Sequence, residues 1–294
     1  MTSNRRFPRR TFLGVAAAGA LAACAPNTSG AGPASTAASD ASGAGTAASG
    51  AAESGAAASP APASAAPSAA PSIAASDATA AATLPPTVAP AASGEPATFV
   101  PNGPRDRRQV ALTFHCAGES ALATRLLDVF KERGVAVTVF AVGSWLDQNP
   151  GLAQRILADG HELANHTWSH GAMRTMGAAT LGDEIARCAK TIERYNGSIG
   201  RWFRPSQIEV PTDAILAAAG KAGYATSVGY DVDSFDFQDP GAAAVRANVA
   251  KSVQGGSIVS MHFGHSNTPA AMPNVLDDLA KSGLQPVTVS TLLA

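Results

Sequence analysis

The chain has 294 residues, of which only 15% are Asp, Glu, Lys or Arg, against about 25% in a typical soluble domain. Its formal net charge of −1 at pH 7 excludes the basic surface that nucleic acids or anionic lipids would attract. No apolar run reaches the length of about 18 residues that a membrane-spanning helix needs, which excludes a polytopic membrane protein. We therefore expect no nucleic-acid partner.

The first 24 residues have the pattern of an export signal. Arg9-Arg10-Thr11-Phe12-Leu13 matches a twin-arginine signal, and a short apolar stretch follows it. That stretch ends at Leu21-Ala22-Ala23-Cys24, which resembles the lipobox of bacterial lipoproteins, in which the cysteine is lipidated. The pattern predicts lipidation at Cys24, with an ordinary cleaved signal as the alternative. It favours an exported protein that is held on the outer face of the cell membrane by a lipid anchor only, or is secreted.

Residues 25–104 are predicted to be a disordered tether. They are nearly all Ala, Ser, Gly, Pro and Thr, and so they lack the large apolar side chains that would offset the entropy of ordering the backbone. The remaining residues, 105–294, are numerous enough for one folded domain. We expect this domain to be monomeric.

Short apolar runs alternate with amphipathic segments from Gln109 onward. Seven strand-like runs separated by six main helical segments predict a parallel α/β fold. A closed barrel of βα units suits this number, and a doubly wound open sheet is the alternative. The expected strands are 110–114, 136–142, 161–166, 201–205, 225–230, 257–261 and 286–289. The expected helices are 120–133, 149–160, 178–195, one that Thr212 or Asp213 caps, 239–252 and one around 275–279.

Five of the six histidines follow the carboxyl ends of predicted strands, where parallel α/β folds hold their active sites. Arg204 and three acidic residues come to the same end of the sheet. The spacing of His166 and His170 can bring two imidazoles to one metal ion. This end of the sheet is therefore predicted to bind a metal and to transfer protons, whereas His161 at a strand start is predicted to be structural or solvated. The residues concerned are His115, His166, His170, His262, His265, Arg204, Asp231, Asp233 and Asp236.

Several of these segments match the motifs of one enzyme family. Residues 160–170, Gly-His-Glu-Leu-Ala-Asn-His-Thr-Trp-Ser-His, are a close match to a metal-binding motif, and Phe203-Arg204-Pro205 resembles a second motif. Residues 110–114, 140–143, 230–237 and 257–262 are similar to four more. From Gln109 to Leu293 the chain thus resembles the NodB-type polysaccharide deacetylases of carbohydrate esterase family 4. The resemblance implies a distorted (β/α)7 barrel.

The same resemblance implies a hydrolase that removes acetyl groups from N-acetylated sugars of polysaccharide or peptidoglycan. Its cofactor would be a divalent metal, usually zinc, which polarises the carbonyl and activates water. By position, His166 and His170 would be metal ligands and His262 the general acid. Arg204 would orient the catalytic base and be steadied by an acidic residue of 230–237, either Asp233 or Asp236.

The first motif departs from the family, because His115-Cys116 stands where two Asp residues are usual. His115 could be the base, and a thiolate of Cys116 could be the third zinc ligand. Alternatively, His115 is the third ligand, Cys116 is a bystander, and Asp233, Asp236 or Glu119 is the base. A third possibility is that hydrolysis has been lost, which would leave a degenerate homologue that binds glycan or metal.

Two further features bear on these alternatives. Pro205-Ser206-Gln207 replaces the family's usual Pro-Pro-Tyr-Gly, so the substrate wall is expected to differ. An esterase or amidase acting on another acylated wall component is therefore a further alternative. Cys188 lies at helical spacing from Ile185 and Ile192, which predicts a small buried side chain, although it could pair with Cys116 in an oxidising compartment.

Overall fold

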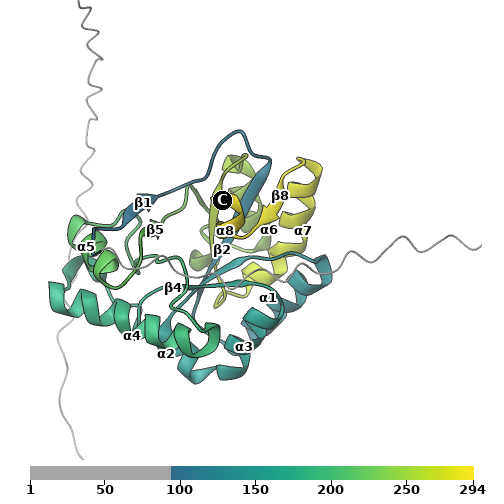
Figure 1. The fold of residues 1–294 in the computed structure, drawn as a ribbon. Coiled ribbons are helices and arrows are strands. Elements are labelled where there is room, and N and C mark those ends of the chain that lie inside the picture. The colour runs from purple at the N-terminus through teal and green to yellow at the C-terminus, as the bar shows by residue number, and fades with distance from the viewer. Residues whose placement is uncertain (1–93) are drawn as a thin grey trace, which may run out of the picture. The chain divides into compact units, whose positions relative to one another are not determined.

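The computed structural model describes residues 94–294 (Figure 1). The predicted signal 1–24, its Cys24 and most of the predicted tether lie outside this range. The strands are β1 (Thr98–Val100), β2 (Gln109–Cys116), β3 (Thr138–Ala141), β4 (Glu162–Asn165), β5 (Thr226–Val228), β6 (Val232–Asp233), β7 (Ile258–His262) and β8 (Gln285–Val287). The helices are α1 (Ser120–Arg133), α2 (Gly143–Gln148), α3 (Pro150–Ala158), α4 (Ala178–Asn196), α5 (Asp213–Lys221), α6 (Ala242–Ser252), α7 (Asn267–Lys281) and α8 (Val289–Leu292), with 3-10 turns η1 (Met173–Thr175) and η2 (Asp236–Gln238).

Every strand pair of the described residues is parallel, which confirms the predicted fold class. The strand order is β4-β3-β2-β7-β6, with β8 beside the start of β2. A second pair, β1-β5, joins β4 through bridges on both sides of Phe203. The predicted strand 201–205 is therefore reduced to a single bridging residue.

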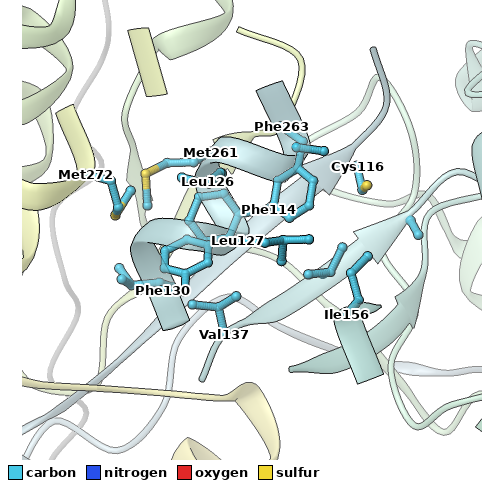
Figure 2. Close-up of a cluster of buried hydrophobic side chains, with 14 of the residues drawn as sticks. Phe114, Cys116, Leu126, Leu127, Phe130, Val137, Ile156, Met261, Phe263 and Met272 are labelled. Atoms are coloured by element: carbon cyan, nitrogen blue, oxygen red, sulfur yellow. The ribbon is translucent and has the colours of Figure 1, made fainter. Parts of the chain in front are cut away.

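β2 is the centre of the fold because it pairs with β3, β7 and β8 (Figure 1). Successive side chains of a strand point to opposite faces, and Phe114 packs on α1 through Phe130, with ring centroids 5.1 Å apart. Leu126, Leu127 and Met272 complete this side of the core (Figure 2). No helix within residues 94–294 is long and apolar enough to cross a membrane.

The predicted helix ends follow local chemistry. Gly134 ends α1 in the left-handed conformation, with φ 61°, and the Thr212 side chain accepts a hydrogen bond from the Ile215 amide at the start of α5. α2 was not predicted from the sequence, because its six residues follow directly on an apolar strand. α6 begins at Ala242, later than the predicted Asp239.

The folded part begins earlier than the predicted boundary at residue 105. β1 pairs with β5, the Ala97 amide donates to the Leu216 carbonyl, and the Gly229 amide donates to the Val100 carbonyl at 2.8 Å. Ala97 is only 3% exposed. The predicted tether 25–104 was therefore wrong at its C-terminal end: a strand of three residues is too short to stand out from a Pro- and Ala-rich segment.

Gly220 of α5 lies against the residues just before β1. A Cβ at this position would overlap the carbonyl of Glu95, so Gly220→Ala is expected to displace β1 and to lower the free energy of unfolding by about 1–3 kcal/mol. Gly182→Ala on α4, where a Cβ meets nothing, is the matched control and is expected to stabilise by about 0.5–1 kcal/mol. Hydrogen exchange at Thr98–Val100 measures the displacement, and unchanged protection there would contradict it.

Candidate active site

Four histidines gather at the carboxyl ends of β2, β4 and β7, as predicted. His115 and His262 stand opposite each other in the β2–β7 register, and their ring centroids are 4.6 Å apart. The ring of His166 stacks on that of His115 at 4.3 Å and 8°, and His170 is 5.0 Å from His166. Parallel pairing therefore brings together residues that are up to 147 positions apart in sequence.

The two remaining histidines lie outside this cluster. His265 is 5.7 Å from the His262 ring, and its Nδ1 pairs with exposed Asp239 at 3.1 Å. His161 is at the opposite end of the sheet, where its Nδ1 accepts a hydrogen bond from the Val137 amide. Burial lowers the pKa of His161 to about 4, so it is the structural residue that its position predicted.

A chain of hydrogen bonds runs from Arg204 through two histidines to Asp236. Arg204 Nη1 lies 3.1 Å from His115 Nε2, and a guanidinium can only donate, so this nitrogen is the acceptor. The proton of His115 is then on Nδ1, which donates to His262 Nε2 at 2.9 Å. His262 in turn carries its own proton on Nδ1, facing Asp236 Oδ1 at 2.7 Å. Both nitrogens of His115 are thus occupied.

Arg204 is buried and holds the ends of three elements together. It donates to the carbonyls of Val228 and Gly229 and to the Thr113 hydroxyl at 2.7–2.9 Å. Its guanidinium lies 4.0 Å from the centre of the Phe140 ring. Burial lowers the pKa of Arg204 to about 9, which leaves it charged at neutral pH. The predicted base-orienting residue therefore contacts residue 115 of the first motif.

Asp236 and Asp233 have different environments. Asp236 is buried and accepts hydrogen bonds from the His262 ring, the His262 amide and the Thr268 hydroxyl. Burial alone would raise the pKa of Asp236, but the hydrogen bonds from His262 and Thr268 lower it on balance. Burial raises the pKa of half-buried Asp233, which accepts one hydrogen bond, from the Phe235 amide. Asp236 is thus fixed in orienting His262, whereas Asp233 retains capacity to accept a proton.

The third acidic residue of this segment has a structural role. Asp231 forms a salt bridge with Arg105 at 2.8 Å. It also accepts hydrogen bonds from the Ile258 amide and the Ser257 hydroxyl. Asp231 therefore attaches the segment before β2 to the start of β7 and takes no part in the histidine cluster.

The loop that carries His166 and His170 has strained backbone and is held by hydrogen bonds to Glu184. Thr167 and His170 have φ of 69° and 59°, a region that side-chain-bearing residues seldom adopt. Glu184 of α4 accepts hydrogen bonds from the Trp168 amide and from both the amide and the hydroxyl of Ser169. Sequence reasoning missed Glu184, although an acidic residue on the inner face of an amphipathic helix was a usable signal.

The loop after Phe203 supports His170 from the other side. Ser206 donates to the Gly171 carbonyl at 2.6 Å, and Gln207 donates to the His170 carbonyl at 2.6 Å. These two residues are the ones that depart from the family pattern in sequence. Their observed contacts are with the loop of His170.

The described residues fit a divalent metal only in part. His166 Nδ1 donates to the Arg204 carbonyl at 2.9 Å, so Nε2 has a lone pair, and this buried atom has no hydrogen-bond partner among residues 94–294. Burial holds the pKa of His166 well below its ordinary value, which keeps it neutral. His170 is a second donor, but catalytic zinc sites use three protein donors, and no such group of three lies in this range. The two imidazoles are therefore an incomplete donor set for a catalytic zinc ion.

The prediction that Cys116 is a metal ligand is wrong. Its side chain is 0% exposed and lies in the apolar core with Phe114 and Phe263 (Figure 2). Because successive residues of a strand point to opposite faces, Cys116 is on the other face of β2 from His115. Burial raises the pKa of the Cys116 thiol well above its ordinary value. This position agrees with the alternative in which Cys116 takes no part in metal binding. Cys188 is likewise buried in the core, and both thiols are free.

Known proteins resemble this chain in sequence and in fold. The family described as polysaccharide deacetylase matches residues 102–227. A peptidoglycan-N-acetylglucosamine deacetylase of Bacillus cereus is 30% identical over 194 residues, which are 65% of this chain and 90% of the relative.

Solved structures also share the fold. A family 4 carbohydrate esterase from Streptomyces lividans, in complex with acetate, is 30% identical, with a TM-score of 0.57 over 64% of this chain and 93% of the esterase. A family 4 pseudoenzyme from Bacillus anthracis superposes with a TM-score of 0.64 at 24% identity, over 67% of this chain and 69% of its own.

Proposed function

Because this chain belongs to the polysaccharide deacetylase family, we propose that it removes acetyl groups from N-acetylated sugars of peptidoglycan or a related polysaccharide. The observation that carries the proposal is the Asp236–His262 pair at the end of β7, directly beside His115, on which His166 stacks. This pair has the arrangement of a proton donor fixed by a buried carboxylate.

Hydrolysis breaks the acetamide C–N bond: water supplies the hydroxyl that becomes part of acetate, and the leaving nitrogen takes a proton. Asp236 accepts from His262 Nδ1, so in the role of general acid His262 would carry the proton that it gives up on Nε2. The proton on Nε2 of a charged His262 would then face the Nδ1–H of His115, so that contact would break. His262 would be free to give the proton to the leaving amine.

Asp233 is the acidic residue best suited to take a proton from water. It is half-buried, and burial raises the pKa of its carboxyl. His115 is less suited than its sequence position suggests, because one nitrogen accepts from Arg204 and the other donates to His262. We therefore propose Asp233 as the base and His115 as the residue that links Arg204 to His262.

A second candidate function is glycan binding without turnover. It is favoured by the lack of a third metal donor among residues 94–294 and by the occupied nitrogens of His115. Acetate release from N-acetylglucosamine oligomers and peptidoglycan fragments decides between the two, with the B. cereus deacetylase as a positive control. Release above that of heat-treated protein supports hydrolysis. Binding without release supports the second candidate. An O-acetylated panel in the same assay tests the esterase alternative.

We propose zinc as the ion to supply in that assay, because imidazole donors suit it. With two donors, the protein is expected to retain less than one equivalent of zinc after dialysis. His166→Ala should weaken retention at least about tenfold, because even the loss of a residue that only orients a ligand costs about 10- to 100-fold in metal affinity. His161→Ala, at the far end of the sheet, is the control. Zinc content measured by atomic absorption checks this, and equal retention by all three proteins would contradict a His166 site.

The cellular setting is also a proposal. The twin-arginine pattern and Cys24 support export and a lipid anchor on the outer face of the membrane, or secretion. A cell-envelope glycan would then be within reach of the domain. The charge balance supports the absence of a nucleic-acid partner, and we propose a monomer.

A further inference from the structure

Ser206 and Gln207 depart from the family pattern, and the proposed chemistry uses neither of them. They follow Arg204, whose carbonyl accepts from the His166 ring, so they lie beside the loop that carries His166 and His170. The Ser206 side chain is 0% exposed. Because burial of a hydroxyl without hydrogen bonds is unfavourable, the partners of this hydroxyl indicate what it does.

The Ser206 hydroxyl joins the two ends of this loop. It accepts from the buried Thr167 hydroxyl at 3.1 Å and donates to the Gly171 carbonyl at 2.6 Å. Thr167 directly follows His166, and Gly171 directly follows His170. One hydroxyl therefore sets the separation of the residues that are next to the two imidazoles.

The loop depends on such contacts because its backbone is strained beside each imidazole. Thr167 has φ 69° and His170 has φ 59°, in the left-handed region that is unfavourable for residues with a Cβ. A strained conformation persists only where the surrounding structure over-determines it. Ser206 supplies two of the hydrogen bonds that do so, and Gln207, itself at φ 55°, supplies a third.

The His170 end of the loop depends on these two side chains in particular. In the part of the chain that the structure describes, the carbonyls of His170 and Gly171 accept hydrogen bonds only from Gln207 and Ser206. Glu184, on the other side, bonds the middle of the loop. Loss of the Ser206 and Gln207 contacts would therefore release His170 while the middle of the loop stayed attached.

We propose that Ser206 and Gln207 are positioning residues, which set the distance of 5.0 Å and the angle of 61° between the His166 and His170 rings. The residues that depart from the family pattern thus act on this imidazole pair. The inference rests on the proposed function only where it concerns zinc, for which these two imidazoles are the proposed donors.

The test observes the imidazoles directly, by NMR of the full chain with isotope-labelled histidine. His→Ala variants assign the ring C–H signals of His166 and His170. Ser206→Ala removes both hydrogen bonds of the hydroxyl, and we expect it to shift the His170 signal while that of His161, at the far end of the sheet, stays in place. Ser227→Ala is the matched control, because the Ser227 side chain is also 0% exposed but its hydroxyl has no hydrogen-bond partner within residues 94–294.

Two further variants keep the test independent of folding. Gln207 is exposed, so Gln207→Ala should fold normally and should also shift the His170 signal. Thr167→Ser keeps the hydroxyl that donates to Ser206 and should retain the wild-type spectrum, whereas Thr167→Val removes it and should shift the His170 signal. Thermal unfolding of each variant checks that the fold persists.

Titration of the same proteins with zinc chloride alone gives a second measurement. We expect Ser206→Ala to weaken zinc binding about tenfold and Ser227→Ala to change it less than about twofold, because residues that orient a ligand contribute to metal affinity. This measurement needs no substrate and no turnover.

An unchanged His170 signal in both Ser206→Ala and Gln207→Ala would overturn the positioning role, as would an equal shift in Ser227→Ala. If the signal moves as expected but acetate release is absent from the wild type, the proposed hydrolysis fails and the positioning role stands. If acetate is released and the signal does not move, the positioning role fails and the hydrolysis stands.

Discussion

Replacing His262 with alanine is expected to lower the rate of acetate release by about 10²- to 10⁴-fold, the usual contribution of a positioned acid or base. The variant removes the proton donor and leaves the Asp236 carboxylate buried without its ring partner. His262→Gln keeps a side-chain N–H donor that can face Asp236, so an equal loss in this variant would assign the effect to proton transfer. Initial rates of acetate release at saturating substrate measure it.

His265→Ala is the matched control for this experiment. His265 shares the loop of His262, but its ring pairs with exposed Asp239. The His265→Ala variant should therefore release acetate at a rate close to that of the wild type. Comparable losses in His262→Ala and His265→Ala would show that the loop, rather than the proton donor, was disturbed. Undiminished release by His262→Ala would overturn the assigned role.

Cys116→Asp is expected to destabilise the protein by about 3–5 kcal/mol, because a carboxyl group would enter the apolar cluster of Phe114 and Phe263 without a partner. The family pattern that the sequence resembles would predict the opposite, since it has Asp at this position. Chemical denaturation followed by tryptophan fluorescence measures the change. Cys116→Ala is the control and should cost only about 1–2 kcal/mol, the price of a small cavity.

The zinc content of the Cys116→Asp protein makes the same test sharper. A variant as stable as the wild type that also gained a full equivalent of zinc would mean that residue 116 faces the histidines. That result would contradict the placement of the residue 116 side chain in the apolar core. A destabilised variant with unchanged zinc content agrees with a core position.

Regular features of the fold could be predicted from sequence because each depends on neighbours along the chain. Alternating apolar runs predicted β2 and β3, and Gly134 marked the end of α1 correctly. β1 could not be predicted, because its three residues become a strand only by pairing with β5, more than a hundred positions away. The bridge at Phe203 likewise depends on its neighbours β4 and β5.

The sequence could predict which residues gather at the site, but not the direction in which their side chains point. Strand ends placed His115, His166 and His262 together, because parallel strands end on one side. The direction of Cys116 could not be read from its motif, since a one-residue step along a strand changes the face. The occupation of both His115 nitrogens also depends on Arg204, which approaches from a different strand end.

The pairing of β1 with β5 has a mechanical consequence. The Val100 carbonyl accepts from the Gly229 amide, and the Gly229 carbonyl accepts from Arg204, which in turn contacts His115. A load applied to the chain before Thr98 would be borne first by α5, through the bond from Ala97 to Leu216, and then by β5. From Gly229 it would reach His115 within two hydrogen-bonded steps. Tension on the chain before Thr98 is therefore transmitted to the histidine cluster through the hydrogen bonds of Gly229 and Arg204.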